Sequence, residues 1–124
     1  EEVEQAILSV ANAEGIEITE FTVAPQVNPA VGELPYHEWF VEFVNEPKDL
    51  KSFCEKVDLA LQKKNIYYFD LIEGKILQKL IIRSLKKDAF VNYMRAEGKL
   101  GGQNKVPRLS NDRKLAEVLE GFIR

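Results

Sequence analysis

Residues 36–44 alternate between two kinds of side chain, and this pattern limits the possible folds more than any other stretch of the chain. One face of the predicted strand carries His37, Trp39, Val41 and Phe43. The opposite face carries Glu38 and Glu42, which we expect to be ordinary solvated glutamates. A strand with one apolar face must pair with a neighbour and pack against another layer, so the chain needs a sheet covered by helices.

Apolar spacing predicts the remaining elements. A first helix carries Val3 to Ala11 and ends at Gly15, and a strand follows over 16–23 with a bulge near Thr19 and Glu20. The next helix is capped by Asn45, has Pro47 in its first turn and carries an apolar stripe from Leu50 to Leu61. An apolar segment broken at Gly74 and a strand over 77–85 follow it. The chain then forms a helix from Phe90 to Gly98 and a last helix that is capped by Ser110 or Asn111 and carries Leu115 to Phe122.

This order of elements predicts an α+β fold, a two-layer sandwich with a mixed or antiparallel sheet covered by helices. Residues 1–124 suit a single domain, since a chain of this length can bury a real core without a disulfide or structural metal. Three strands are few for a free-standing sheet, and the chain starts with Glu1 rather than Met. We therefore expect a domain excised from a larger protein.

Cysteine content and hydropathy restrict the setting. No apolar run approaches the roughly 18 residues that a membrane span needs, so no membrane partner is expected. Cys54 is the only cysteine and there is no secretory leader, which favours a reducing, cytoplasmic location. No CxxC motif or His/Cys cluster is present, so we predict no metal site in this chain.

Charge is unevenly distributed. Residues 1–46 hold ten glutamates and no Lys or Arg, whereas residues 75–124 hold twelve basic and five acidic residues. Such a split can focus an anion onto one face, or it can simply supply two solvated surfaces. The sequence leaves both interpretations open.

A punctuated loop in the basic half is the best candidate for chemistry. Gly101 and Gly102 permit positive φ and close backbone approach to a ligand, and Pro107 fixes its own φ while restricting the residue before it. Lys105 and Arg108 therefore lie on pre-shaped backbone. An ammonium and a planar guanidinium presented in this way suit a phosphate or a carboxylate.

Other reactive or aromatic residues have structural interpretations. We expect His37 to be a core or edge histidine rather than a general base, and Cys54 to be a buried structural thiol. The aromatic run at 67–69 could stack nucleic-acid bases, but packing is favoured because recognisable RNA-binding signatures are missing. Residues 110–112 are most simply a helix cap.

The segment Gly-Gly-Gln-Asn-Lys-Val-Pro-Arg at 101–108 resembles the Gln-aromatic-Lys-x-Pro-Arg loop of the auxin-responsive acyl-acid amido synthetases, the Gretchen-Hagen-three family. Residues 35–43 resemble the strand of that family's small domain, and Phe90 matches a position in the helix before the loop. Asn104 and Leu109 depart from the aromatic and the cysteine frequent in plant members, which favours a bacterial-type member acting on another acid.

The resemblance implies the small C-terminal domain of an adenylate-forming enzyme. Such a ligase activates a carboxylic acid with ATP and then joins it to an amine or amino acid. ATP and Mg²⁺ would be bound mainly by an N-terminal domain of the same polypeptide, whose nucleotide-binding motifs are absent from this chain. The isolated domain is therefore expected to be inactive.

The resemblance implies roles for five residues of the 101–108 segment. Lys105 matches the lysine that reaches the nucleotide phosphates when the domains close, and is the implied catalytic residue. Gln103 and Arg108 would shape the loop or touch phosphate, and Gly101 and Gly102 would let its backbone bend.

Two alternatives remain at the level of sequence. A small α+β binding module could use the basic C-terminal half to hold an anionic partner such as RNA, and its binding would weaken steeply with salt. A purely structural or regulatory domain would tolerate replacement of Lys105 and Arg108. The missing RNA-binding signatures make nucleic acid the less favoured partner.

Overall fold

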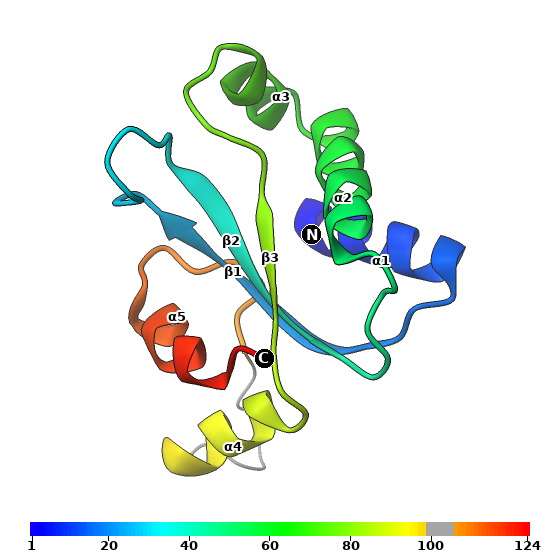
Figure 1. Cartoon of the computed structure of the whole chain (residues 1–124), viewed down its shortest axis with the longest axis vertical. Helices are drawn as coiled ribbons and strands as arrows, with labels where there is room; N and C mark the ends of the chain where they lie inside the picture. The colour runs from blue at the N-terminus through cyan, green and yellow to red at the C-terminus, as the bar shows by residue number, and fades with distance from the viewer. Residues whose placement is uncertain (99–105) are drawn as a thin grey trace.

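A computed structural model describes residues 1–98 and 106–124, and it builds a mixed three-stranded sheet with helices on both faces (Figure 1). The elements in chain order are α1 (Glu2–Glu14), β1 (Ile18–Gln26), β2 (Tyr36–Phe43), α2 (Leu50–Lys64), α3 (Ile66–Glu73), β3 (Ile81–Ser84), α4 (Ala89–Ala96), α5 (Lys114–Leu119) and the 3₁₀ turn η1 (Glu120–Phe122). The predicted α+β class and mixed sheet are confirmed.

The sheet has the order β1-β2-β3, with β2 in the centre. Strands β1 and β2 are antiparallel, and their register runs from Ile18 opposite Phe43 to Gln26 opposite Tyr36. It shifts between Ile18 and Glu20, which confirms the predicted bulge. Strands β2 and β3 are parallel, because α2 and α3 carry the chain back to the end of the sheet at which β2 begins.

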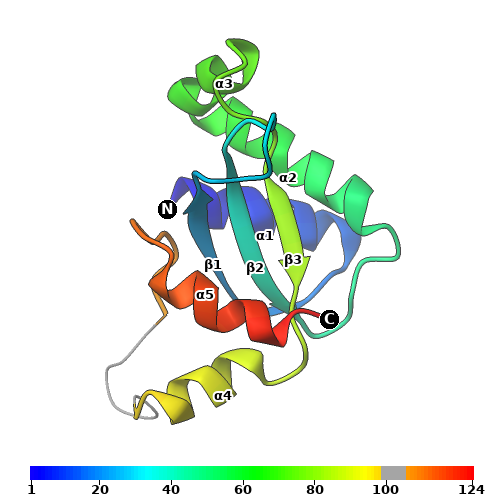
Figure 2. The same ribbon diagram turned by 60° about the vertical axis from the view of Figure 1, so that its left-hand side comes forward.

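One face of the sheet packs against α1 and α2 in a core of large apolar side chains (Figure 2). Trp39 and Phe21 stack with ring centres 5.8 Å apart, and Phe43 meets Phe53 of α2 edge to face at 5.6 Å. These aromatic pairs come from β1, β2 and α2. The alternation of residues 36–44 correctly predicts this face.

The opposite face is covered by α4 and α5, which gives a third layer beyond the two predicted (Figure 2). Its core contains smaller residues and two aromatics: Ala24, Phe40, Leu85, Ala89, Phe90, Val106, Leu115, Ala116 and Leu119. The two predicted C-terminal helices thus pack on the face that carries Glu38 and Glu42. Both of these glutamates are only 3% exposed, so the expectation that they are solvated is wrong.

Several element boundaries differ from the predicted ones for local reasons. Asp49 rather than Asn45 caps α2, because its Oδ1 accepts a 3.0 Å hydrogen bond from the Ser52 N–H. Segment 66–73, to which the sequence assigns no element, is the helix α3, and Asn65 caps it. Strand β3 is shorter than the predicted 77–85, since the Leu80 N–H donates to Asp58 rather than to β2. None of the helices in residues 1–98 and 106–124 combines the length and apolarity needed to cross a bilayer.

Candidate functional site

The predicted site residues fall on both sides of the boundary of the described structure. Lys105, Gln103, Gly101 and Gly102 lie outside the described residues, whereas Arg108 lies inside them. The structure therefore defines the site through residues 106–113, which follow Lys105 directly in sequence. We call residues 106–110 the anchor segment.

The anchor segment lies along the outer edge of β1. The Val23 N–H donates to the Arg108 carbonyl at 3.0 Å, and the Ser110 N–H donates to the Val23 carbonyl at 2.8 Å. These two bonds form a parallel bridge between Val23 and Leu109. The loop predicted to carry cations is thus fixed to the sheet at its C-terminal side.

The start of the anchor segment is fixed by a hydrogen bond from Thr22 and by burial of its own first side chain, Val106. Thr22 is fully buried, and its hydroxyl donates a 2.6 Å hydrogen bond to the Pro107 carbonyl. Val106 is 9% exposed and packs in the core beneath α4 and α5. The backbone directly after Lys105 is therefore tied to both the sheet and the α4/α5 layer.

The Arg108 side chain contacts residues of α1 and β1. Its Nε donates to Glu4 Oε1 at 3.1 Å, and its guanidinium also forms an ion pair with Glu20. The guanidinium carbon lies 4.7 Å from the centre of the Phe21 ring, within cation–π range. These partners all belong to this chain, and the Arg108 side chain is still 40% exposed.

Glu38 lies at the centre of an ion cluster beneath α5. Its Oε2 accepts a 2.7 Å hydrogen bond from Arg83 Nε of β3, and its Oε1 lies 2.9 Å from Arg113 Nη2 without hydrogen-bond alignment. Arg113 also donates to the Pro25 carbonyl at 3.0 Å and to Glu120 at 3.0 Å. One buried carboxylate thereby links β2, β3 and the start of α5, which explains why it is not solvated.

Glu42 caps α4 through its side chain. Its Oε2 accepts from the Asp88 N–H at 2.8 Å, and its Oε1 accepts from the Phe90 N–H at 3.1 Å. These are donors at the beginning of a helix, which have no partner inside the helix itself. Glu42 thus fixes the helix that precedes residues 99–105.

The uneven charge distribution is partly resolved inside the molecule. Four arginines of the basic half reach glutamates of the acidic half: Arg83 to Glu38, Arg108 to Glu4 and Glu20, Arg113 to Glu38, and Arg124 to Glu46. Guanidinium groups held in this way are less available to a phosphate backbone. The pairing supports a structural origin for much of the asymmetry and gives no support to the RNA-binding alternative.

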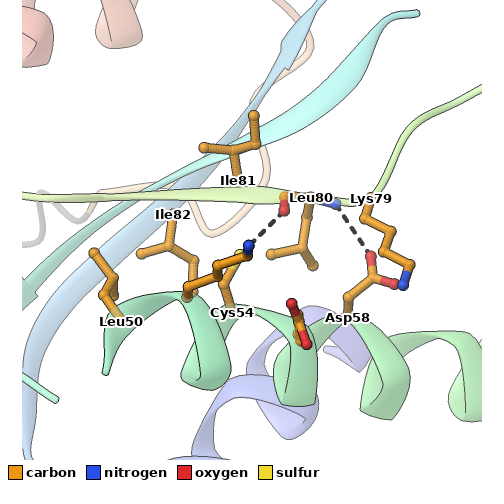
Figure 3. A pocket seen from close by; sticks show the side chains of 9 residues that line it. Leu50, Cys54, Asp58, Lys79, Leu80, Ile81 and Ile82 are labelled. Atoms are coloured by element: carbon orange, nitrogen blue, oxygen red, sulfur yellow. Dashed lines mark hydrogen bonds between the residues drawn. The ribbon is translucent and has the colours of Figure 1, made fainter. Parts of the chain in front are cut away.

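Cys54 lines an apolar cavity of about 410 Å³ between α2 and β3 (Figure 3). Leu50, Leu80 and Ile82 form its walls, and the Cys54 thiol donates to the Leu80 carbonyl at 3.1 Å. Burial raises the pKa of this thiol, which disfavours the nucleophilic thiolate. Cys54 is half-buried rather than buried as expected, and its hydrogen bond supports a structural role.

His37 stacks on Tyr68 with ring centres 5.3 Å apart, at the edge of the α1/α2 core. Burial lowers its pKa, and the negative charge of Asp58 partly opposes this shift. The hydroxyl of the buried Tyr68 donates to Asp58, and the ring stacks on the histidine, as a packing residue should. Its neighbours Tyr67 and Phe69 are exposed instead, so only part of the aromatic run packs in the core.

The described residues do not fit a magnesium site of their own. No group of three or more His, Cys, Asp or Glu side chains in residues 1–98 and 106–124 converges closely enough to hold a metal ion. The glutamates nearest the anchor segment, Glu4 and Glu20, already pair with Arg108. We assign no metal chemistry to this part of the chain.

Comparison with known proteins identifies the family. A search of curated protein sequences found no match. The solved structures of "GH3.15 acyl acid amido synthetase" and "AtGH3.15 acyl acid amido synthetase in complex with 2,4-DB" share the fold, with TM-scores of 0.79 and 0.75 and identities of 16% and 17%. Each match covers 99% of this chain but 23% of the solved one, so the chain spans about a quarter of their length.

The family model described as "GH3 family C-terminal domain" matches residues 1–114, which include both flanks of the candidate loop. This match spans every strand and most of the helices described above. The chain belongs to the GH3 family and is its C-terminal domain.

Proposed function

We propose that this chain is the C-terminal domain of an ATP-dependent acyl-acid amido synthetase. In the first half-reaction, a carboxylate attacks the α-phosphate of ATP and releases pyrophosphate, giving an acyl-adenylate. In the second, an amine or amino acid attacks the acyl carbon and AMP leaves, giving an amide. Family membership supports this assignment, together with the names of the solved relatives. ATP, Mg²⁺ and the acid would be held mainly by an N-terminal domain of the same polypeptide.

Lys105 is the residue that this domain contributes. Negative charge builds up around the α-phosphorus in the first transition state, and an ammonium delivered by domain closure stabilises it with little reorganisation. Closure also excludes water, which strengthens the interaction. Reopening would withdraw Lys105 before the amine step.

One observation carries this role more than any other: the chain directly after Lys105 is firmly anchored. Thr22 and Val23 hold Pro107, Arg108 and Ser110 through three hydrogen bonds of 2.6–3.0 Å. A catalytic cation must be attached to a fixed part of the backbone, because a small error in its position slows the chemical step strongly. The anchor segment provides such a fixed point, and the ion pairs of Arg108 with Glu4 and Glu20 help to hold it in place.

Substitution of Lys105 in the full-length enzyme tests the proposal. Lys105→Ala should slow single-turnover formation of the acyl-adenylate on the order of 10²- to 10³-fold, the usual cost of losing one electrostatic donor. Lys114→Ala removes an exposed lysine at the start of α5 and serves as the matched control. Adenylate formation at the wild-type rate in the Lys105 variant would refute the assignment.

A further inference from the structure

We propose that Thr22 is a positioning residue for Lys105, acting through its hydrogen bond to Pro107. This inference rests on the proposed function, since it names the residue that aims the catalytic cation. Thr22 lies on β1 and is separated from Pro107 by 85 positions in sequence. Its hydroxyl is bonded to the backbone of the anchor segment, so it would act through that backbone.

The chemistry of Pro107 makes this contact unusual. Proline has no N–H, so its carbonyl is the only backbone group through which it can be held. That carbonyl accepts the Thr22 hydroxyl at 2.6 Å. A hydroxyl buried as completely as that of Thr22 loses free energy if it has no partner, so both groups favour the bond.

The contact also lies at the right place along the chain. The bonds between Val23 and the anchor segment are made at Arg108 and Ser110, farther from Lys105. Pro107 fixes its own φ and restricts Val106, so holding its carbonyl fixes the backbone of residues 106–107, which follow Lys105 in sequence. Among the described side chains, Thr22 makes the hydrogen bond to the anchor segment that is nearest to Lys105 in sequence.

The alternative is that Thr22 has only a structural role, and this alternative predicts a different result. β-Branched residues are favoured in strands, and Thr22 could be retained for that reason alone. In that case its loss would weaken the whole domain and would act equally with or without Lys105. The positioning role instead predicts that the two residues act as a unit.

The test uses the full-length enzyme and two substitutions at residue 22. Thr22→Val keeps the shape and removes the hydroxyl, whereas Thr22→Ser keeps the hydroxyl. We expect Thr22→Val to slow single-turnover adenylation on the order of 10-fold, with the KM for ATP nearly unchanged, because a small displacement of a catalytic group costs rate rather than binding. Thr22→Ser should restore at least half of the wild-type rate, and in a Lys105→Ala background Thr22→Val should have no further effect.

The outcomes separate this inference from the proposed function. If Thr22→Val adenylates at the wild-type rate while Lys105→Ala is slow, the positioning role is wrong and the proposed function stands. An equal effect of Thr22→Val with and without Lys105 would also overturn it. If Lys105→Ala is itself at the wild-type rate, the proposed function fails. Should Thr22→Val not yield folded enzyme, Thr22→Ala supports the same comparison.

Discussion

The two faces of the sheet are built differently, although the same three strands supply both. The face beneath α1 and α2 is a large, aromatic-rich apolar core in which Trp39 and Phe53 are fully buried, and one buried carboxylate, Asp58 of α2, lies on this side. The face beneath α4 and α5 has fewer aromatic core residues and two buried carboxylates on the sheet itself, Glu38 and Glu42. Packing dominates the first face, whereas carboxylates of β2 bind the covering helices on the second.

This difference follows from what each face must position. Helices α1 and α2 cover the sheet mainly through non-directional apolar contact, and Asp58 of α2 adds hydrogen bonds to Tyr68 and Leu80. Helices α4 and α5 come before and after residues 99–105 in the sequence, and their N-terminal ends are fixed by directional contacts from Glu42 and from Glu38 through Arg113. Directional contacts specify where a helix begins, so this face fixes the two helices that flank the candidate loop in sequence.

The largest expected effect lies on the apolar face. Trp39→Ala should lower the free energy of unfolding by about 3–5 kcal/mol, because it removes a fully buried aromatic and leaves a cavity. Urea unfolding of the 124-residue chain measures it. Tyr67→Ala is the matched control, since Tyr67 is 80% exposed and its loss should cost less than about 0.5 kcal/mol. Similar costs for the two variants would contradict the packing account.

A smaller and more local effect is expected on the charged face. Glu42→Gln keeps the size of the side chain but leaves one of the two α4 donors without a carboxylate oxygen, so unfolding should become easier by about 1–3 kcal/mol. Amide hydrogen exchange should speed up at Asp88 and Phe90 while β1 and β2 stay protected. The exposed Glu117→Gln is the control. Uniform loss of protection throughout the chain would show that Glu42 does not act locally.

The smallest effect is a pH dependence from His37. Burial lowers the pKa of the folded His37 below its unfolded value of about 6.5, so below that pH the unfolded chain binds the proton more readily. Stability should therefore be complete above pH ~6.5 and fall as the pH drops toward the folded pKa. His37→Phe keeps a ring against Tyr68 and should flatten this slope in urea unfolding. An unchanged slope would mean that His37 is not the group responsible.

Much of the fold could be predicted because its signals are local. Helix α1 ends at Gly15, whose φ of 70° is the left-handed conformation that glycine adopts readily. The bulge near Glu20 and the apolar face of β2 follow from periodicity alone. Helix α3 could not be predicted from its short apolar run, because such runs fit a strand or a helix equally well.

The buried glutamates could not be predicted, because their partners are distant in sequence. Glu38 is 45 residues from Arg83, and Glu42 is 46 residues from Asp88. The alternation of residues 36–44 places Glu38 and Glu42 on a polar face. The structure is needed to see that α4 and α5 pack on that face. Arg108 could be located in a functional loop from its motif, but its pairing with Glu4, 104 residues away, needed the structure. Thr22 carries no sequence signal that links it to the loop.

The most direct test of the account separates the two half-reactions in Lys105→Ala full-length enzyme. Acyl-adenylate formation from ATP and acid should fall on the order of 10²- to 10³-fold. Amide formation from a supplied acyl-adenylate and amine should stay near the wild-type rate, because the proposed cycle withdraws Lys105 before that step. The claim that this domain delivers a cation to the nucleotide phosphates would be contradicted if both half-reactions slowed equally, or if neither slowed.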